Sequence, residues 1–415
     1  MVTLGAGFMG DSHPKMFDAL VVPRFGFLLS AGWFWSIARW GAGFIGAFVV
    51  NNQTGSARLV QLTGVAMWAP LLLGGLVGGV LSDRYDRRLT VIVQFVVLIP
   101  LAIGLGLAGM TDRLELWMVY PFLVIVGVGW VVDMTSRRAI IYDMVGARHI
   151  DNAMALESVA SASGLAIGAL VGGTVIEALG VGQAFVAVAV LLGLALVCTL
   201  AVPKVEKRSV SGGSGLEAFV AGVKMLRSER ALVSVLGVTV FVDFFFFALL
   251  PLVQVIGTDL DAGPTLLGLL AAMIGFGMMG GSLVLARFQP RRRGVFYVCG
   301  SFIALLFAIP FAAASSYWLA AGSMFIASFG LGFFGSTQGL IVMTAVDEAR
   351  RGRALGLLST AIGVLPIGMI ALGELAEVIG ASPAVVASSV TGALGLAVWL
   401  RYWPESWRVN ADEAS

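Results

Sequence analysis

Two ionisable side chains lie in the middle of long apolar runs, where a charge is costly. Arg39 is in the first of these runs, and Asp243 is in a later one, within the sequence VDFFFF. A charge at the centre of a membrane helix costs about 2.5–3.5 kcal/mol on insertion scales. A carboxyl group there could take up a proton and release a paired guanidinium, as a proton-coupled switch requires. A permanent structural pair, or solvation by cavity water, would explain the same residues.

Glu177 and Glu374 are further candidates for proton coupling. Each lies near the outer end of a long apolar run, and the two runs occupy equivalent places in an internal repeat. Glu157 and Glu377 lie near the ends of the same two runs. For all four, a carboxylate that reaches the membrane surface is the simpler interpretation.

A dense group of charges occurs in GGVLSDRYDRR, residues 78–88. Five of the six positions from Asp83 to Arg88 are charged, in a chain with only 12% charged residues. This concentration predicts a turn at the membrane surface. The turn either anchors the topology or has a function of its own.

The motifs of several enzyme classes are missing from the sequence. None of the four lysines follows a glycine, so there is no Walker-type phosphate loop, and the two histidines are isolated. No Gly-x-Ser-x-Gly elbow occurs. We therefore expect no enzyme activity, no cofactor and no metal. The net charge of +2 gives no reason to expect nucleic-acid binding, and Cys198 and Cys299 are predicted to pack as small apolar residues.

The apolar runs predict an all-α integral membrane protein. Mean hydropathy is +0.95, and 59% of the residues are hydrophobic. Continuous runs of spanning length predict helices rather than strands, and the 54 glycines suit close helix packing. We place twelve spans, at residues 25–50, 59–82, 89–109, 115–136, 151–179, 184–202, 231–257, 265–288, 295–314, 318–342, 354–380 and 384–403.

The positions of Lys and Arg predict the orientation. With both termini in the cytoplasm, all but three of the 26 basic residues fall on the cytoplasmic side. Arg58 and Arg113 fall outside, and Arg39 lies within a span. This asymmetry favours twelve spans with cytoplasmic termini, in a bacterial inner membrane.

The chain contains a tandem repeat. Residues 145–158 resemble residues 346–359, with Val145 matching Val346 and Ala153 matching Ala354. Two parallel six-helix halves with a solute site between them are therefore expected. The predicted parts are an N-terminal segment 1–24, a first bundle 25–202, a linker 203–230 with an amphipathic surface helix, a second bundle 231–403 and a tail 404–415.

The charged turn resembles the signature loop of the major facilitator superfamily. The pattern is Gly79-x-Leu81-x-Asp83-Arg84-x-x-Arg87-Arg88, and a decayed copy, GGSLVLARFQPRRR, follows in the second half. The resemblance covers essentially the whole chain and implies a gate. Asp83 would lie near the start of span 11, while Arg84 or Arg87 would reach Asp133 near the end of span 4. These contacts would form only when the cytoplasmic side is closed.

Span 5 resembles an exporter motif of the same superfamily. Gly164, Gly168, Gly172 and Gly173 match it, but Ala169 replaces the proline of the family pattern. The glycines are expected to permit close packing against a facing helix. Three further stretches, LTGVAMWAPLLLGGLVGG, DMTSRRAIIYDMV and ARRGRALGLLSTAIG, resemble the branch with enterobactin exporters and multidrug antiporters. In that branch an Asp and an Arg stand where this chain has Asp133 and Arg137.

Aromatic residues are expected to line the solute cavity. The candidates are Trp33, Trp40, Phe44, Trp68, Trp130, Phe244 and Phe247. They suit a small amphipathic solute. The predicted function is a monomeric, proton-coupled exporter of a drug-like or siderophore-like molecule that works by alternating access in the lipid bilayer. An importer or a lipid flippase of the same fold is the alternative, and a receptor or scaffold without transport is a third hypothesis from a different class.

The orientation predicts which positions react from outside the cell. After Cys198 and Cys299 are replaced, single cysteines at Arg58 and Arg113 should react with an impermeant thiol reagent on intact cells, and a cysteine at Arg292 should not. Labelling is read on the purified protein, with lysed cells as the control for reactivity. The reverse pattern would overturn the orientation.

Overall fold

The described part of the chain is helical. The computed structural model describes residues 18–84, 86–203, 224–226, 229–288, 290–347 and 350–408, and for residues 73–84, 147–148 and 151 it describes the backbone alone. No β-strand occurs within these ranges. The predicted surface helix of the linker falls almost entirely outside them.

The first half of the chain forms one bundle of long helices. An apolar run in lipid must satisfy its backbone hydrogen bonds internally, and a helix does so. The elements are η1 (Asp18–Val21), α1 (Phe25–Thr54), α2 (Ala57–Arg84), α3 (Arg87–Met110), α4 (Leu116–Leu179) and α5 (Val181–Ala201).

The second half forms the other bundle. Its elements are α7 (Arg230–Phe245), η2 (Phe247–Leu249), α8 (Leu252–Asp259), α9 (Pro264–Phe288), α10 (Arg293–Ala312), α11 (Tyr317–Thr344), α12 (Arg351–Ile362), α13 (Leu365–Ile379), α14 (Ala381–Tyr402) and α15 (Glu405–Arg408).

Eleven helices in the described residues are long and apolar enough to cross a membrane. The chain is thus a multi-pass membrane protein. The exact number of twelve stays a prediction. The remaining predicted span is α2, of which the stretch Ala57–Leu72 forms a shorter apolar helix with described side chains.

Two predicted spans are each divided between helical segments. The predicted span 231–257 ends as α7 at Phe245, passes through η2 and continues as α8 after Pro251. Proline lacks the N–H that a continuous helix would need there. The predicted span 354–380 divides into α12 and α13 around Gly363 and Val364.

Single glycines make the tight turns between several helices. Gly180 (φ 103°) alone joins α4 to α5, and Gly380 (φ 91°) alone joins α13 to α14. Positive φ favours glycine at both positions. Gly146 (φ 66°) separates α4 into an ascending and a descending helix, which correspond to two of the predicted spans. Gly180 and Gly380 take equivalent places in the two halves, as a tandem repeat requires.

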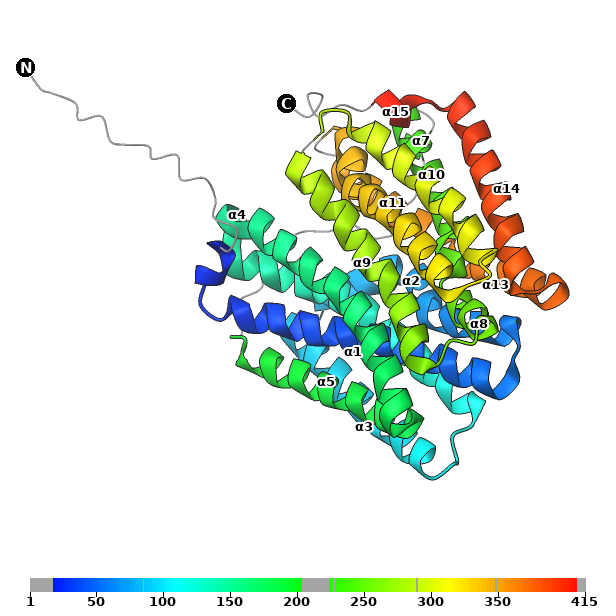
Figure 1. The fold of residues 1–415 in the computed structure, drawn as a ribbon. Coiled ribbons are helices and arrows are strands. Elements are labelled where there is room, and N and C mark those ends of the chain that lie inside the picture. Colours follow the sequence, from blue (N-terminus) through cyan, green and yellow to red (C-terminus); the bar gives the residue numbers. More distant parts are fainter. Residues whose placement is uncertain are drawn as a thin grey trace, which may run out of the picture.

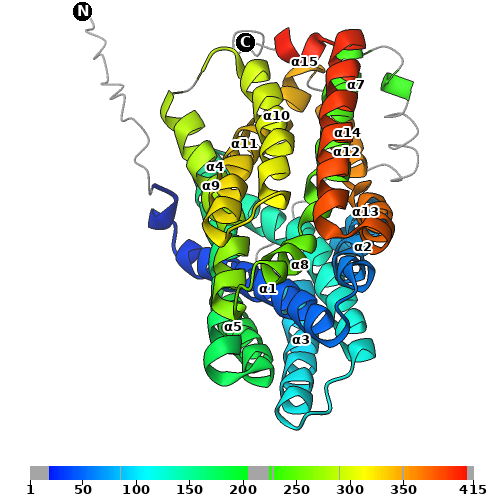
Figure 2. The ribbon, with the colours of Figure 1, turned by 45° about the vertical axis from the view of Figure 1, so that its right-hand side comes forward.

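The two bundles meet along two seams. The descending part of α4 packs on α9, and α2 packs on α13. Figures 1 and 2 show the bundles inclined to each other, with α8 close to α1 and α13 close to α2. We call the end with the turns at Gly55, Gly180 and Gly380 the distal end. The opposite end, where α1 begins and α14 finishes, is the terminal end.

Glycines on α4 allow backbone-to-backbone contact on two sides. A Cβ atom at Gly168 would lie 2.5 Å from the Ile37 carbonyl oxygen and 2.9 Å from the Gly41 nitrogen of α1. Gly164 and Gly172, one turn away on either side, also face α1. Gly173 faces the other bundle, where its Cβ would overlap the Pro264 carbonyl oxygen of α9.

The α1–α4 contact predicts a strong penalty for one added methyl group. Gly168→Ala should lower stability by about 1–3 kcal/mol, because backbone atoms rather than flexible side chains would have to move. The matched control is Gly104→Ala on α3, where nothing lies within 4 Å of the new atom. Thermal unfolding in detergent should fall by several degrees for the first variant only. Equal melting temperatures would contradict the packing.

Candidate functional site

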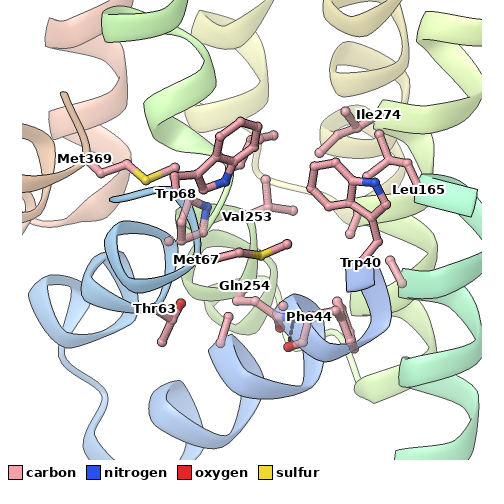
Figure 3. A pocket seen from close by; sticks show the side chains of 17 residues that line it. Trp40, Phe44, Thr63, Met67, Trp68, Leu165, Val253, Gln254, Ile274 and Met369 are labelled. Carbon is pink, nitrogen blue, oxygen red and sulfur yellow. Dashed lines mark hydrogen bonds between the residues drawn. The ribbon is translucent and has the colours of Figure 1, made fainter. Parts of the chain in front are cut away.

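An apolar cavity lies between the two bundles, beside the break after α7. It encloses about 90 Å³ of free space. In Figure 3, Trp40 and Trp68 lie next to each other in its lining, and Met67, Phe44 and Gln254 lie below. Its lining comes from both halves: α1, α2 and α4 on one side, and the α7–α8 connection, α8, α9 and α13 on the other. Such a site changes shape whenever the two bundles move.

Few polar atoms face this cavity. Gln254 donates from Nε2 to the Phe44 carbonyl oxygen (3.3 Å), and its Oε1 is buried without a hydrogen-bond partner in the described part of the chain. Thr63 donates to the Val60 carbonyl oxygen (2.7 Å) of its own helix. The lining therefore favours a solute with a large apolar surface and few fixed polar contacts.

Three of the seven aromatic residues predicted to line the cavity do so. They are Trp40, Phe44 and Trp68. Trp130 stands behind Trp68, with ring centroids 4.4 Å apart in an edge-on arrangement. The other three lie outside the lining.

The outlying rings have identifiable contacts. Trp33 donates from its indole nitrogen to the Ser163 hydroxyl (3.0 Å). Phe244 packs on Phe245 and against Gly368, and Phe247 packs on Phe246. Sequence placed these rings at a suitable depth, but the side of the helix that faces the cavity depends on packing.

Arg137 is the centre of a buried ionic network in the first bundle. Its Nε and Nη2 donate to Asp133 Oδ1 (2.9 Å) and Oδ2 (2.8 Å), and its Nη1 lies 2.7 Å from Glu157 Oε1. All three side chains are largely buried. Glu157 joins the ascending and descending parts of α4 through this network, so the interpretation that it reaches the membrane surface is wrong. In the sequence, this contact is indicated by the position of the Glu157 carboxyl group close to the apolar run that carries Arg137.

Arg39 and Asp243 form no ion pair in the described structure. Arg39 belongs to the first bundle, where its guanidinium carbon lies 4.6 Å from the ring centroid of Trp40 and 4.1 Å from that of Trp130. It is also within electrostatic range of Asp133. The repeat predicts the depth of the two residues but not their direction around each helix, which is why the pairing fails here.

Asp243 lies in the second bundle, two residues before α7 ends. It is 4% exposed, and its Oδ2 is buried without a hydrogen-bond partner among the described residues. One turn earlier, Thr239 lies 3.0 Å from the Tyr297 hydroxyl and accepts a hydrogen bond from Gln338 Nε2 (3.0 Å). A buried carboxyl group without a partner is costly to keep charged.

The charged turn is divided between several structural contacts. Asp86 caps α3 by accepting from Arg88 N (2.9 Å), and Arg88 donates to the last carbonyl oxygens of α5, including that of Leu200 (2.8 Å). Arg87 pairs with Asp143 at 2.6 Å, so the expected contact from Arg87 to Asp133 is not formed. The side chains of Asp83 and Arg84 lie outside the described residues. Gly79 is described by its backbone alone, within α2.

Two carboxylates close the distal end by the same arrangement in both halves. Glu177, three residues before Gly180, accepts from the Thr265 backbone nitrogen (2.8 Å) at the start of α9. Glu377, three residues before Gly380, accepts from Ser56 Oγ (2.8 Å) and the Arg58 nitrogen (3.2 Å) at the start of α2. Each contact joins a carboxylate of one bundle to a helix N-terminus of the other, where negative charge is favoured.

Glu377 is therefore the residue of the second half that makes the contact equivalent to that of Glu177, and a coupling role for Glu374 stays a prediction. Glu374 lies one turn earlier and is 3.9 Å from Arg58 Nη1 at an exposed position. In the sequence, Glu377 is identified as the equivalent of Glu177 by its position three residues before the turn glycine.

The described polar contacts show at which end the two bundles are joined. Asn51 Nδ2 donates to Thr258 Oγ1 (3.0 Å) across the distal end, and Gln61 Nε2 donates to the Ala248 carbonyl oxygen (2.9 Å) deeper in the interface. The ion pairs described near the terminal end, such as Arg87–Asp143 and Arg350–Glu229, each stay within one bundle. The bundles are thus joined at the distal end. Among the described residues, no group of three or more His, Cys, Asp or Glu could hold a metal ion.

The sequence matches one protein family. The match to the Major Facilitator Superfamily covers residues 28–368. No curated protein sequence is significantly similar to this chain.

Solved transporter structures share the fold at low sequence identity. A bacterial homolog of the human lysosomal transporter Spinster, inward-facing and occupied, has a TM-score of 0.71 at 16% identity, covering 97% of this chain and 99% of that one. A POT family transporter in complex with a thioalcohol-conjugated peptide has a TM-score of 0.73 at 13% identity, with 92% and 96% covered. A D-xylose–proton symporter has a TM-score of 0.70 at 13% identity, with 94% and 100% covered.

The paired carboxylates predict how the distal end responds to mutation. Glu177→Gln combined with Glu377→Gln should shift the population toward separated distal ends, because the two charged acceptors at helix N-termini are lost and, of the charged contacts described between the bundles at this end, only the exposed Arg58–Glu374 pair remains. Spin labels at Arg113 and Ser315 would report the distance. Glu115→Gln, at the same end and within one bundle, is the control. An unchanged distance distribution in the double variant would remove these carboxylates from the closure.

Proposed function

Because the chain belongs to the major facilitator superfamily, we propose that it is a proton-coupled exporter of a small amphipathic molecule. The fold is that of a transporter, and its similar structures are transporters. In alternating access, the cavity between the bundles opens to one side of the membrane and then to the other. The exporter direction and the drug-like or siderophore-like solute follow the resemblance of the local sequence stretches.

The cavity is the observation that carries this proposal. It is apolar, it contains the rings of Trp40, Phe44 and Trp68, and both bundles contribute to it. An apolar, aromatic lining favours solutes with a sizeable hydrophobic part. A receptor or scaffold without transport would need no such cavity between two halves.

The predicted orientation in the membrane indicates to which side the described conformation is open. With both termini in the cytoplasm, the distal end faces outward, and the Glu177 and Glu377 contacts close the extracellular side. The described conformation would then face the cytoplasm, where an exporter loads its solute. We place the protein in a bacterial inner membrane, as a monomer.

The charged turn would act in the opposite conformation. Closing the terminal end would bring the last part of α2, with Gly79, Asp83 and Arg84, toward the second bundle, with Asp83 near the start of α12. Arg87 and Arg88 hold the charged turn on the first bundle through Asp143 and the end of α5. Asp133 and Arg137 would keep the neighbouring helix in place.

Asp243 is the proposed proton carrier. It is buried, its Oδ2 has no hydrogen-bond partner among the described residues, and it lies beside the break that leads to the cavity-lining residues of α8. A charged Asp243 favours polar surroundings, and a protonated Asp243 favours apolar ones. Proton uptake would therefore change which conformation of this break is favoured, and this would couple protonation to movement of the second bundle. One similar structure is a proton symporter, in line with such coupling. Glu177 and Glu374 are the next coupling candidates.

Asp243→Asn should separate transport from binding. The amide mimics the protonated acid permanently, so gradient-driven transport should fall by about tenfold or more while downhill exchange stays within about twofold. Inverted membrane vesicles with an imposed pH gradient and a panel of amphipathic dyes measure the first quantity, and dye exchange without a gradient measures the second.

The control for this experiment is Asp112→Asn in an exposed distal turn. Wild-type gradient-driven transport in the Asp243 variant would exclude Asp243 as the carrier and move the test to Glu177 and Glu374. Dye movement only in the direction opposite to export would favour the importer.

A further inference from the structure

Arg39 is a buried cation without a direct anionic partner. It is 4% exposed and lies near the middle of α1, and its Nε and Nη1 are buried without hydrogen bonds among the described residues. Guanidinium groups at this depth ordinarily pair with a carboxylate or with carbonyl oxygens. An anion that binds the Arg39 guanidinium therefore has to come from elsewhere.

The nearby carboxylates are already engaged. Both oxygens of Asp133 accept hydrogen bonds from Arg137, and Glu157 lies against Nη1 of the same residue. Asp133 stabilises the charge of Arg39 only from a distance. Nε and Nη1 of Arg39 therefore remain without hydrogen bonds among the described residues.

The tryptophan rings leave the edge of Arg39 available. The rings of Trp40 and Trp130 lie over the guanidinium carbon at 4.6 Å and 4.1 Å. Such cation–π contacts cover the faces of the planar group, whereas its N–H donors point outward in the plane. A carboxylate binds a guanidinium through this edge, by two parallel hydrogen bonds.

Arg39 is not itself part of the cavity lining, but it lies directly behind two residues that connect to that lining. Its neighbour Trp40 lines the cavity, and so does Gly43, one helical turn further along the same side of α1. Trp130 is connected to the lining through Trp68. Because α1 runs from the terminal to the distal end, Arg39 lies on the terminal side of the cavity, where the bundles are not joined by the described polar contacts.

We propose that Arg39 binds the negative group of the transported molecule, so that the substrate is an amphipathic organic anion. The apolar or aromatic part fills the cavity that Trp40 and Trp68 help to line, and a carboxylate or similar group reaches the donors of Arg39. This inference rests on the proposed transport function and specifies its substrate class. An anion at this place completes the hydrogen bonds that the first bundle leaves open.

The test compares two probes that differ only in charge. Naphthalene-2-carboxylate and naphthalene-2-carboxamide are titrated into the full-length protein in uncharged detergent, with tryptophan fluorescence and thermal unfolding as readouts. Wild type should bind the carboxylate about tenfold or more tightly than the amide, as expected for a desolvated charged hydrogen bond.

Variants of Arg39 test whether this residue causes the tighter binding of the carboxylate. Arg39→Gln should abolish the preference for the carboxylate while changing amide binding by less than about twofold. Arg39→Lys should keep part of it, because the charge remains without the planar fork. Arg113→Gln, an exposed arginine at the distal end, should behave as wild type. If Arg39→Gln does not fold, Arg39→Met replaces it in the same titration.

Two results would overturn the proposal. One is wild-type protein that binds the amide as tightly as the carboxylate or binds neither probe. The other is a carboxylate preference that survives the removal of Arg39. Binding in detergent requires no proton gradient, so these results are independent of the Asp243 transport assay, and failure of either hypothesis is recognised separately.

Discussion

The close contact of α4 with two partners fixes the interface between the bundles. One side of the descending helix lies against α1, where Gly164 and Gly168 approach backbone atoms and Gly172 approaches side chains, and Gly173 on another side lies against α9. A single helix thus determines both the internal packing of the first bundle and its distance from the second. Small residues make this possible in a membrane, where helix association depends on packing rather than on exclusion of water. The cavity lies beside α4 because α1 and α9 are held there by the same helix.

Charge is distributed unequally between the two bundles. The first bundle contains an ionic network around Arg137, together with Arg39 between two tryptophan rings. In the second bundle, Asp243 lies beside neutral polar groups, Thr239 and Tyr297 among them. No direct ion pair joins Arg39 to Asp243 in the described structure, so each bundle keeps its own buried ionisable group.

The helix positions follow closely from hydropathy, because a membrane demands long apolar runs. The breaks after Phe245 and around Gly363 do not appear in hydropathy, since the residues around them remain apolar. Family resemblance was likewise visible in the charged turn, whose residues lie at a surface and need no knowledge of packing.

The sequence predicts how far along each helix the site residues lie, but not which side of the helix they occupy. Arg39 and Asp243 were placed at similar depth, yet the rotation of each helix about its axis decides which neighbours they meet. The same reason explains why Trp40 and Trp68 line the cavity while Trp33 and Phe244 do not. Glu377 shows that fine register matters too, because a shift of one turn separates it from Glu374.

The duplicated carboxylate contacts at the distal end have a consequence for ion leakage. Glu177 and Glu377 belong to different bundles and act at different seams, so rupture of either one leaves the other in place. The Asn51–Thr258 hydrogen bond is a further contact at the same end. In a transporter, a closure secured at several places would make uncoupled ion leakage rarer, because several contacts have to be lost at the same moment.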